Sequence, residues 1–101
     1  MFFDGNILSA ALDKWGENKQ TDILIEEMSE LTQEIIKTRR AHCPYKSFPL
    51  IEEMVDVMIC IEQLKLVLRK DFMGNFDQTL QNLADQKMRR LAKRIEDEHE
   101  S

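Results

Sequence analysis

The stretch of sequence that decides the fold runs from residue 23 to residue 56 and reads ILIEEMSELTQEIIKTRRAHCPYKSFPLIEEMVD. Two acidic groups lie near its ends, one made of Glu26, Glu27 and Glu30 and the other of Glu53 and Asp56. A helix turns about 100° per residue, so Glu27 and Glu30 lie roughly 60° apart around its axis. Glu53 and Asp56 repeat this spacing. The pattern predicts two acidic helices joined by a loop.

Four of these carboxylates, those of Glu27, Glu30, Glu53 and Asp56, converge if the two helices pack antiparallel. Like charges that close raise the pKa of at least one carboxyl group. A hard cation relieves the repulsion, and oxygen-only ligands suit Mg²⁺, with Mn²⁺ as a possible substitute. The alternative is two solvated acidic faces, which explains Asp56 poorly because this residue lies within the apolar run 54–61. We therefore expect a metal site.

Iron is a poor fit to the same acids. A di-iron carboxylate bundle needs Glu-x-x-His on two of its helices. The two histidines, His42 and His99, fall in an expected loop and an expected tail. The sequence therefore favours a site made of oxygen ligands alone.

The chain as a whole predicts an all-α protein with four helices. Its 101 residues include only three Gly and two Pro and are rich in good helix formers. We expect helices over residues 6–15, about 18–40, 50–70 and 75–96, with a loop at 41–48, a break at 71–74 and a frayed tail at 97–101. Asn6 and Gly16 bound the first helix, Pro49 suits the start of the third, and Asn75 with Gln78 resembles a capping box.

Apolar residues at helical spacing predict the buried faces of three helices. These faces comprise Ile7, Leu8, Ala11, Leu12 and Trp15 in the first helix, Leu24, Met28, Leu31 and Ile35 in the second, and Phe76, Leu80, Leu83, Leu91 and Ile95 in the fourth. The third helix is apolar nearly all round between residues 54 and 61. Burial on every side of a helix in so small a chain usually needs a second subunit, so we expect a homo-oligomer.

Composition bounds the function classes. The length fits one domain over residues 1–101, and the net charge of −5 argues against nonspecific nucleic-acid binding. No secretory signal is apparent, and the longest apolar run is too short to span a membrane. Cys43 and Cys60 show neither metal-type spacing nor the density of a disulfide framework. We expect a soluble cytoplasmic protein with reduced thiols.

Three further features have two interpretations each. Lys87, Arg90 and Arg94 share one helical face, which is either solvated and balanced by the acids of the tail or binds phosphate. Trp15 is either a core residue or a platform for stacking a base. In the loop, Tyr45 and Lys46 are either solvated or within reach of a ligand. No Gly-rich phosphate loop and no nucleophile for covalent catalysis is present in the sequence.

The paired acidic motif resembles that of the MazG-type, all-α nucleoside triphosphate pyrophosphohydrolases. That family is marked by Glu-Glu-x-x-Glu followed, one to three dozen residues later, by Glu-x-x-Asp. Here Glu26-Glu27-Met28-Ser29-Glu30 and Glu53-Met54-Val55-Asp56 stand 22 residues apart. Trp15-Gly16, Gln20 and the segment Lys87-Met88-Arg89-Arg90 are also similar to family segments. The resemblance covers roughly residues 8–95.

The resemblance implies a four-helix, bundle-like MazG fold that assembles as a homodimer or homotetramer. Glu27, Glu30, Glu53 and Asp56 would ligate Mg²⁺, and Glu26 would orient or deprotonate a water. Lys87 and Arg90 would bind the phosphates, with Trp15 as a further substrate contact. The reaction implied is hydrolysis of (deoxy)nucleoside triphosphates between the α- and β-phosphates, in nucleotide-pool house-cleaning.

Two alternatives stay open at this point. The related phosphoribosyl-ATP pyrophosphohydrolase of the histidine pathway shares this kind of fold. A non-catalytic helical oligomer that binds a partner or a nucleotide would carry the same helices without the chemistry. Such a binding module should show no Mg²⁺-dependent stabilisation.

Overall fold

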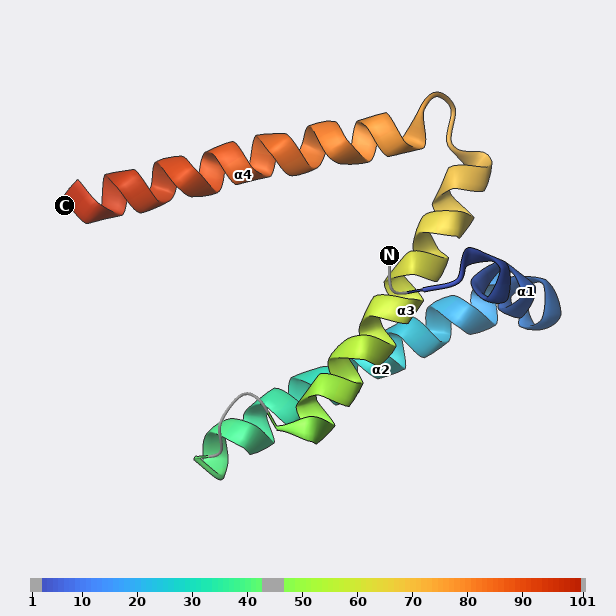
Figure 1. Ribbon diagram of the computed structural model, residues 1–101, viewed down its shortest axis with the longest axis horizontal. Coiled ribbons are helices and arrows are strands. Elements are labelled where there is room, and N and C mark those ends of the chain that lie inside the picture. Colours follow the sequence, from blue (N-terminus) through green and yellow to red (C-terminus); the bar gives the residue numbers. More distant parts are fainter. Residues whose placement is uncertain (1–2, 43–46, 101) are drawn as a thin grey trace. The chain divides into compact units, whose positions relative to one another are not determined.

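Four α-helices make up the described part of the computed structural model, which covers residues 3–42 and 47–100, the last two without their side chains. They are α1 (Gly5–Trp15), α2 (Glu17–Arg40), α3 (Phe48–Asp71) and α4 (Phe76–Glu100), and this part of the chain contains no strand (Figure 1). The predicted all-α class with four helices is confirmed. The chain divides into two compact units, Met1–Val67 and Leu68–Ser101, which we describe one at a time.

Gly16 separates α1 from α2. Its φ of 89° is a conformation that L side chains rarely adopt, and its backbone N–H donates to the carbonyl oxygen of Leu12. The same residue precedes the first turn of α2, which begins at Glu17 and not at residues 18–21. The hydroxyl of Thr21 donates to the backbone of Glu17 and Asn18 inside the helix, so it does not cap α2.

The predicted cap of α1 is also displaced. Asp4, not Asn6, caps the helix, because its carboxylate accepts a 2.9 Å hydrogen bond from the backbone N–H of Asn6. Along the predicted apolar face, Leu8 is buried and Ala11 is partly buried, whereas Ile7 and Trp15 are exposed. The interpretation of Trp15 as a core residue is therefore wrong for this chain.

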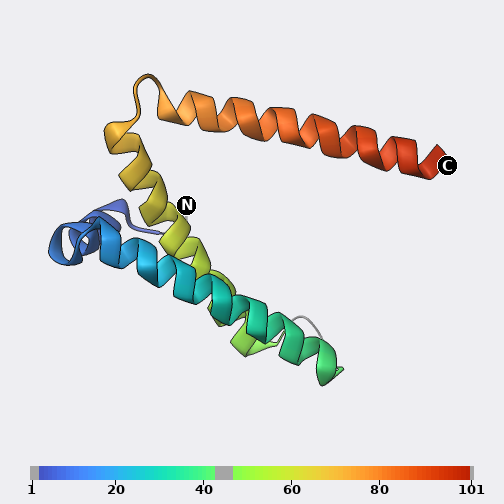
Figure 2. The same ribbon diagram turned by 180° about the vertical axis from the view of Figure 1, so that it is seen from behind.

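Helices α2 and α3 run antiparallel side by side (Figures 1 and 2). At the loop end of this hairpin, Ile35 and Leu50 line the same apolar groove of about 430 Å³. At the other end, Gln20 and Gln63 line a second cavity of about 250 Å³. Residue numbers thus rise along α2 as they fall along α3, which is the packing that brings the two acidic segments together.

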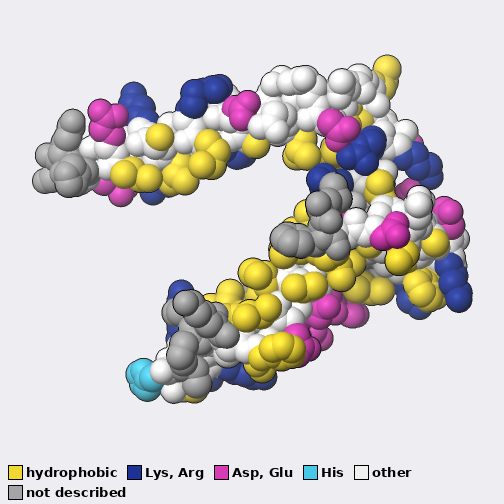
Figure 3. Space-filling view, viewed as in Figure 1, with side chains coloured by type: hydrophobic (Ala, Val, Ile, Leu, Met, Phe, Trp, Pro, Cys, Tyr) yellow, Lys and Arg dark blue, Asp and Glu magenta, His cyan; other side chains and the backbone are white. Residues whose placement is uncertain are grey.

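The core of the first unit is narrow. Its buried apolar residues are Leu8, Leu24, Leu50, Val57 and Cys60, and no large side chain among the described residues is fully buried. Met28, predicted to face the core, is 51% exposed, and Met54 is also exposed on α3. Hydrophobic side chains accordingly cover much of the visible surface of the hairpin (Figure 3).

In the second unit, Asn75 caps α4. Its side-chain oxygen accepts a 3.0 Å hydrogen bond from the backbone N–H of Gln78. The side chain of Gln78 does not return the bond but donates to Asn82 at 2.9 Å, so the cap lacks the reciprocal half of a capping box. In the first turn of α4, Asp77 pairs with Arg69 at 2.7 Å, and the ring of Phe76 forms a T-shaped contact with that of Phe72.

Helix α4 departs from two predictions. It continues to Glu100, so the segment 97–100 is helical and not frayed. Its predicted buried stripe is exposed at Leu80, Leu83, Leu91 and Ile95, and Figure 3 shows hydrophobic side chains gathered along one side of this helix. The apolar spacing was identified correctly, but nothing within the second unit covers it.

Among the described residues, no helix combines the length and the hydropathy that a membrane span requires.

Candidate metal centre

Two carboxylates lie on the faces along which α2 and α3 pack. In α2, Glu27 lies between Leu24 and Leu31 at spacings of three and four residues, which places all three on one face. In α3, Glu53 lies between Leu50 and Val57 in the same way. Leu24, Leu50 and Val57 are buried, so both acids occupy positions that an ordinary helix pair fills with apolar residues.

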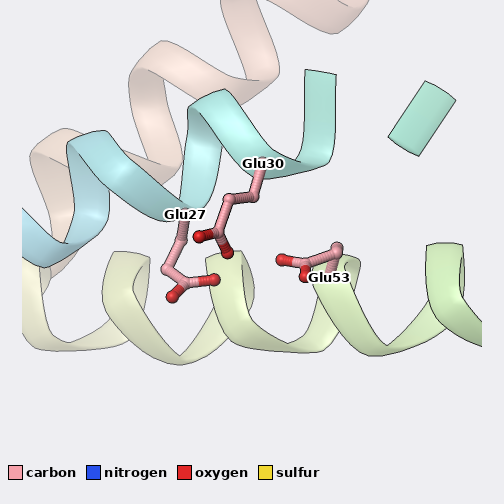
Figure 4. A group of neighbouring side chains, drawn as sticks. All are labelled: Glu27, Glu30 and Glu53. Atoms are coloured by element: carbon pink, nitrogen blue, oxygen red, sulfur yellow. The ribbon is translucent and has the colours of Figure 1, made fainter. Parts of the chain in front are cut away.

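Glu30 joins these two side chains to form a triad. One carboxylate oxygen from each of Glu27, Glu30 and Glu53 lies within 4.8 Å of the others. Figure 4 shows the three side chains extending from the two helices toward one another. Glu27 and Glu53 are partly buried, whereas Glu30 is exposed, so the triad opens to solvent on one side. Three convergent oxygens form a partial ligand set for a hard cation.

Two oxygens of the triad lack any hydrogen-bonding partner. Oε2 of Glu27 and Oε2 of Glu53 are both buried, and no described residue donates to either. A buried acceptor without a donor costs free energy, and the cost is larger for a charged group. A cation bound between the two helices would satisfy these oxygens, and protonation of one carboxyl group would reduce the cost in its absence.

The acids of the triad titrate abnormally. Burial, together with the charges of Glu30 and Asp56 and a hydrogen bond to Glu53, raises the pKa of Glu27 from 4.5 to about 7. Burial and the charge of Glu30 also raise the pKa of Glu53, which the hydrogen bond to Glu27 lowers in part. The predicted repulsion is thus present in the fold.

Asp56 lies beside the triad but not within it. Its charge raises the pKa of both Glu27 and Glu53, and it lines a cavity together with Glu27. Its side chain is exposed within the single chain, although the run 54–61 that contains it is apolar. The structure brings together three of the four predicted ligands and leaves Asp56 next to them. Glu26 is exposed on α2 and is not part of the group.

The cavity that adjoins the triad is lined by both helices. Its lining residues are Gln20, Ile23, Glu27, Asp56, Ile59, Cys60 and Gln63. Cys60 is a buried free thiol, and burial, together with the charges of Glu27 and Asp56, raises its pKa. The thiol therefore stays protonated and is a weak candidate for a metal ligand at neutral pH.

The predicted phosphate-binding residues lie on α4, in the second unit. Arg94 pairs with Glu98 at 3.6 Å, which agrees with a solvated face balanced by the acids of the tail. Lys87 and Arg90 are exposed, and neither forms an ion pair with another residue of the described segments. The pairing of Arg94 supports a solvated, balanced face for that residue, and phosphate binding by Lys87 and Arg90 stays a prediction.

The remaining sequence candidates lie at the edges of the described structure. Trp15 is 50% exposed, and the ammonium nitrogen of Lys14 lies 5.2 Å from its ring centroid. An exposed ring of this kind is accessible for stacking. Cys43, Tyr45 and Lys46 lie outside the described residues.

Comparison with protein-family models, with curated proteins and with solved structures finds no match to this chain. The resemblance to the MazG-type enzymes remains a prediction, and the geometry of the triad alone marks the candidate site.

Sequence reasoning did not assign a role to two polar residues of the adjoining cavity. Gln20 and Gln63 are 7% and 5% exposed, respectively. Each lies seven residues from an acid of the cavity, Gln20 from Glu27 and Gln63 from Asp56, and two helical turns return a side chain to nearly the same face. The sequence feature that could have identified these two residues is a glutamine seven positions from an acid in each helix.

Proposed function

We propose that this protein is a Mg²⁺-dependent nucleoside triphosphate pyrophosphohydrolase. The observation that carries the proposal is the triad of Glu27, Glu30 and Glu53 with its two partnerless buried oxygens. Three oxygens within 4.8 Å of one another, on two packed helices, have the chemistry that a hard divalent cation requires. The spacing of the acids in sequence, which resembles the MazG-type motif, supports the choice of reaction.

In this proposal the three acids of the triad hold Mg²⁺, or Mn²⁺ in its place, and Asp56 joins them as a fourth ligand. The bound ion would supply positive charge for the phosphate oxygens and for the negative charge that develops during the reaction. Ionised carboxylates are required, so the raised pKa of Glu27 makes cation binding compete with a proton.

The proposed reaction consumes one water and releases two phosphate products. The oxygen of the water forms a bond to the α-phosphorus, and the bond from that phosphorus to the oxygen bridging to the β-phosphate breaks. Pyrophosphate leaves with the bridging oxygen, and a nucleoside monophosphate remains. Glu26, next to Glu27 and exposed on α2, accepts the proton of the water in this proposal.

Lys87 and Arg90 are the proposed phosphate partners. Both are exposed and free of ion pairs within the described segments, so neither charge is already neutralised. Guanidinium and ammonium groups bind phosphate oxygens by charge-assisted hydrogen bonds. Trp15 remains a proposed substrate contact because its ring is half exposed.

We propose that the active assembly is a homodimer or homotetramer. Large apolar side chains are exposed along both units, among them Ile25, Met54, Leu83 and Ile95. A second copy of the chain would remove such surface from water. Each Å² of apolar area buried in this way stabilises the assembly by about 25 cal/mol.

The test is the release of pyrophosphate from a panel of ribo- and deoxynucleoside triphosphates, with Mg²⁺ and with excess chelator. The proposal predicts Mg²⁺-dependent release, with the monophosphate as the second product. In ¹⁸O-labelled water the label should enter the monophosphate, since the water attacks the α-phosphorus. Orthophosphate as the product, or label in pyrophosphate, would contradict this reaction.

A matched pair of variants assigns any activity to the triad. Glu53→Gln should abolish release, whereas Glu52→Gln changes the neighbouring exposed acid and should leave it intact. If folded wild-type protein releases no pyrophosphate from any nucleoside triphosphate, the alternatives are phosphoribosyl-ATP as substrate or a binding role without turnover.

A further inference from the structure

We infer that the cavity between α2 and α3 beside the triad is a nucleobase subsite, and that Gln20 and Gln63 determine which base is accepted. This inference rests on the proposed function, because the base is that of the proposed triphosphate substrate. It deepens that function by assigning specificity to two amides that the chemistry of hydrolysis does not use.

The two amides are buried in the wall of the cavity. Gln20 and Gln63 are 7% and 5% exposed and line the cavity from opposite helices. Within residues 3–42 and 47–100, neither side chain forms a hydrogen bond or an ion pair with the rest of the protein. The amide atoms are not among the buried polar atoms without a partner, so they remain open to the cavity that they line. Polar groups that are open to a cavity and not engaged within the described chain are available to a bound molecule.

The other walls suit a flat ring. Ile23 and Ile59 contribute apolar surface from α2 and α3, and both are only partly buried. Polar groups at one end and apolar groups along the sides are the usual composition of a site that fixes the orientation of a small planar ligand. The volume of about 250 Å³ is below that of a typical site for a whole drug-sized ligand, which agrees with a subsite for one ring system.

The position of the amides relative to the acids fits a nucleotide. Gln20 precedes Glu27 by seven residues and Gln63 follows Asp56 by seven, so each amide lies on nearly the same helical face as its acid. Seven residues of helix rise about 10 Å. Phosphates at the triad would therefore leave the base two helical turns away, beside the amides.

Primary amides match the chemistry of a base edge. Each carries a carbonyl acceptor and two N–H donors, so one Gln can form paired hydrogen bonds with a neighbouring donor and acceptor. Nucleobases present such neighbouring groups along their edges, whereas sugar hydroxyls present single groups that donate or accept in any orientation. The two amides therefore favour the base over the sugar as the part that is recognised.

The experiment compares wild type with Gln20→Met and Gln63→Met, which keep side-chain length while removing the amide. Gln33→Met, at an exposed position of α2, is the matched control. The first readout is kcat/KM for the four bases, each as ribo- and deoxynucleoside triphosphate. The second is binding of non-hydrolysable α,β-methylene triphosphates in the presence of Mg²⁺, which is independent of turnover. The third is the Tm of each variant without ligand.

We expect both cavity variants to lower kcat/KM and analogue affinity for the preferred base by about tenfold or more, because an unmatched polar edge is then buried. Discrimination among bases should flatten, ribo-against-deoxy discrimination should stay constant, and Gln33→Met should behave as wild type. The Tm should stay close to that of wild type, because the substitutions remove no side-chain hydrogen bond of the described chain.

Three results would overturn the inference. Unchanged base discrimination in both variants would remove the subsite, and a change confined to ribo-against-deoxy discrimination would assign the cavity to the sugar. Loss of folding or a lower Tm in both variants would show that the amides serve the fold. Failure of the proposed function is distinct, because wild type itself would then release no pyrophosphate.

Discussion

At the scale of single residues, Glu27 is the most informative side chain. It occupies a helix face that carries Leu24 and Leu31, yet it is an acid whose Oε2 is buried without a partner. Such a position is unfavourable for folding in the absence of a cation. The arrangement is explained if the charge of Glu27 serves binding, and it is not explained by packing.

The raised pKa of Glu27 makes the stability of the metal-free protein depend on pH. The folded-state pKa is about 7 against 4.5 in the unfolded chain, so the folded state binds the proton more tightly. The resulting contribution to the free energy of unfolding is complete below pH 4.5 and is lost as the pH rises through about 7. Glu27→Gln removes this dependence. We expect its Tm, relative to wild type, to increase from about pH 5 to about pH 8.

The control for this pH series is Glu52→Gln, which removes an exposed acid next to Glu53. Measured with excess chelator, so that the protein is free of metal, its Tm should change with pH in the same way as that of wild type. A constant difference between Glu27→Gln and wild type at every pH would contradict the assignment of the raised pKa to Glu27.

Asp56 provides a second test at the residue scale. Its charge opposes ionisation of Glu27 and Glu53, so Asp56→Asn should leave the metal-free Tm unchanged or raise it. In the proposed enzyme the same substitution should lower kcat by at least about a hundredfold, since it removes a ligand charge. Steady-state kinetics and thermal unfolding in chelator measure the two effects. Turnover equal to wild type would remove Asp56 from the site.

The sequence could predict the triad but not its surroundings. The spacing of Glu27 and Glu30 placed both on one side of α2, and antiparallel packing of two helices joined by a short loop was enough to bring Glu53 to them. The exposure of Asp56 and the burial of Gln63 were not accessible in the same way. Both depend on which side of α3 faces α2. The run 54–61 is apolar nearly all round, so the sequence does not indicate that side.

At the scale of elements, single Gly, Asp and Asn residues set the helix ends, since Asp4 and Asn75 cap α1 and α4 and Gly16 ends α1. Gly16 ends α1 as predicted, and its φ of 89° explains why a glycine is required there. The start of α2 was predicted at about residue 18, whereas the helix begins at Glu17, because Gly16 both ends α1 and directly precedes α2. The hydroxyl of Thr21 bonds back to the backbone within the helix and marks no helix end.

Gly16→Ala tests this boundary, and Gly5→Ala is its matched control. A Cβ meets no neighbouring atom at either position, so any difference reflects backbone conformation alone. Of these two glycines, Gly16 alone has a positive φ, and we expect Gly16→Ala to lower the free energy of unfolding by about 1–2 kcal/mol. Gly5→Ala, in the first turn of α1, should be neutral or stabilising. Urea unfolding followed by circular dichroism measures both. Equal effects of the two substitutions would refute this account of the boundary.

At the scale of the whole molecule, the exposed apolar surface exceeds the buried core. Five apolar residues of the described chain are buried, whereas residues such as Ile25, Met28, Leu80 and Leu83 are exposed. The sequence predicted stripes at these places because spacing reveals which side chains share a face. It could not specify what covers each face, since a partner subunit and the chain's own helices require the same pattern.

We expect the protein to associate with itself in solution. Sedimentation velocity over a hundredfold range of concentration should show a dimer or tetramer that dissociates on dilution, with a parallel fall in Tm. A single-chain species at every concentration, with a constant Tm, would contradict the proposed assembly.

The central claim is that Glu27, Glu30 and Glu53 hold a divalent cation, and titration with Mn²⁺ followed by electron paramagnetic resonance tests it most directly. The sharp spectrum of free Mn²⁺ weakens as the ion binds to the protein, so its intensity measures the free concentration. Recovery of that intensity on addition of Mg²⁺ would show that the two ions compete for one site. We predict saturable binding to wild type and to Glu52→Gln, and at least about tenfold weaker binding to Glu30→Gln. Equal binding to wild type and Glu30→Gln, or no saturable binding to wild type, would contradict the claim.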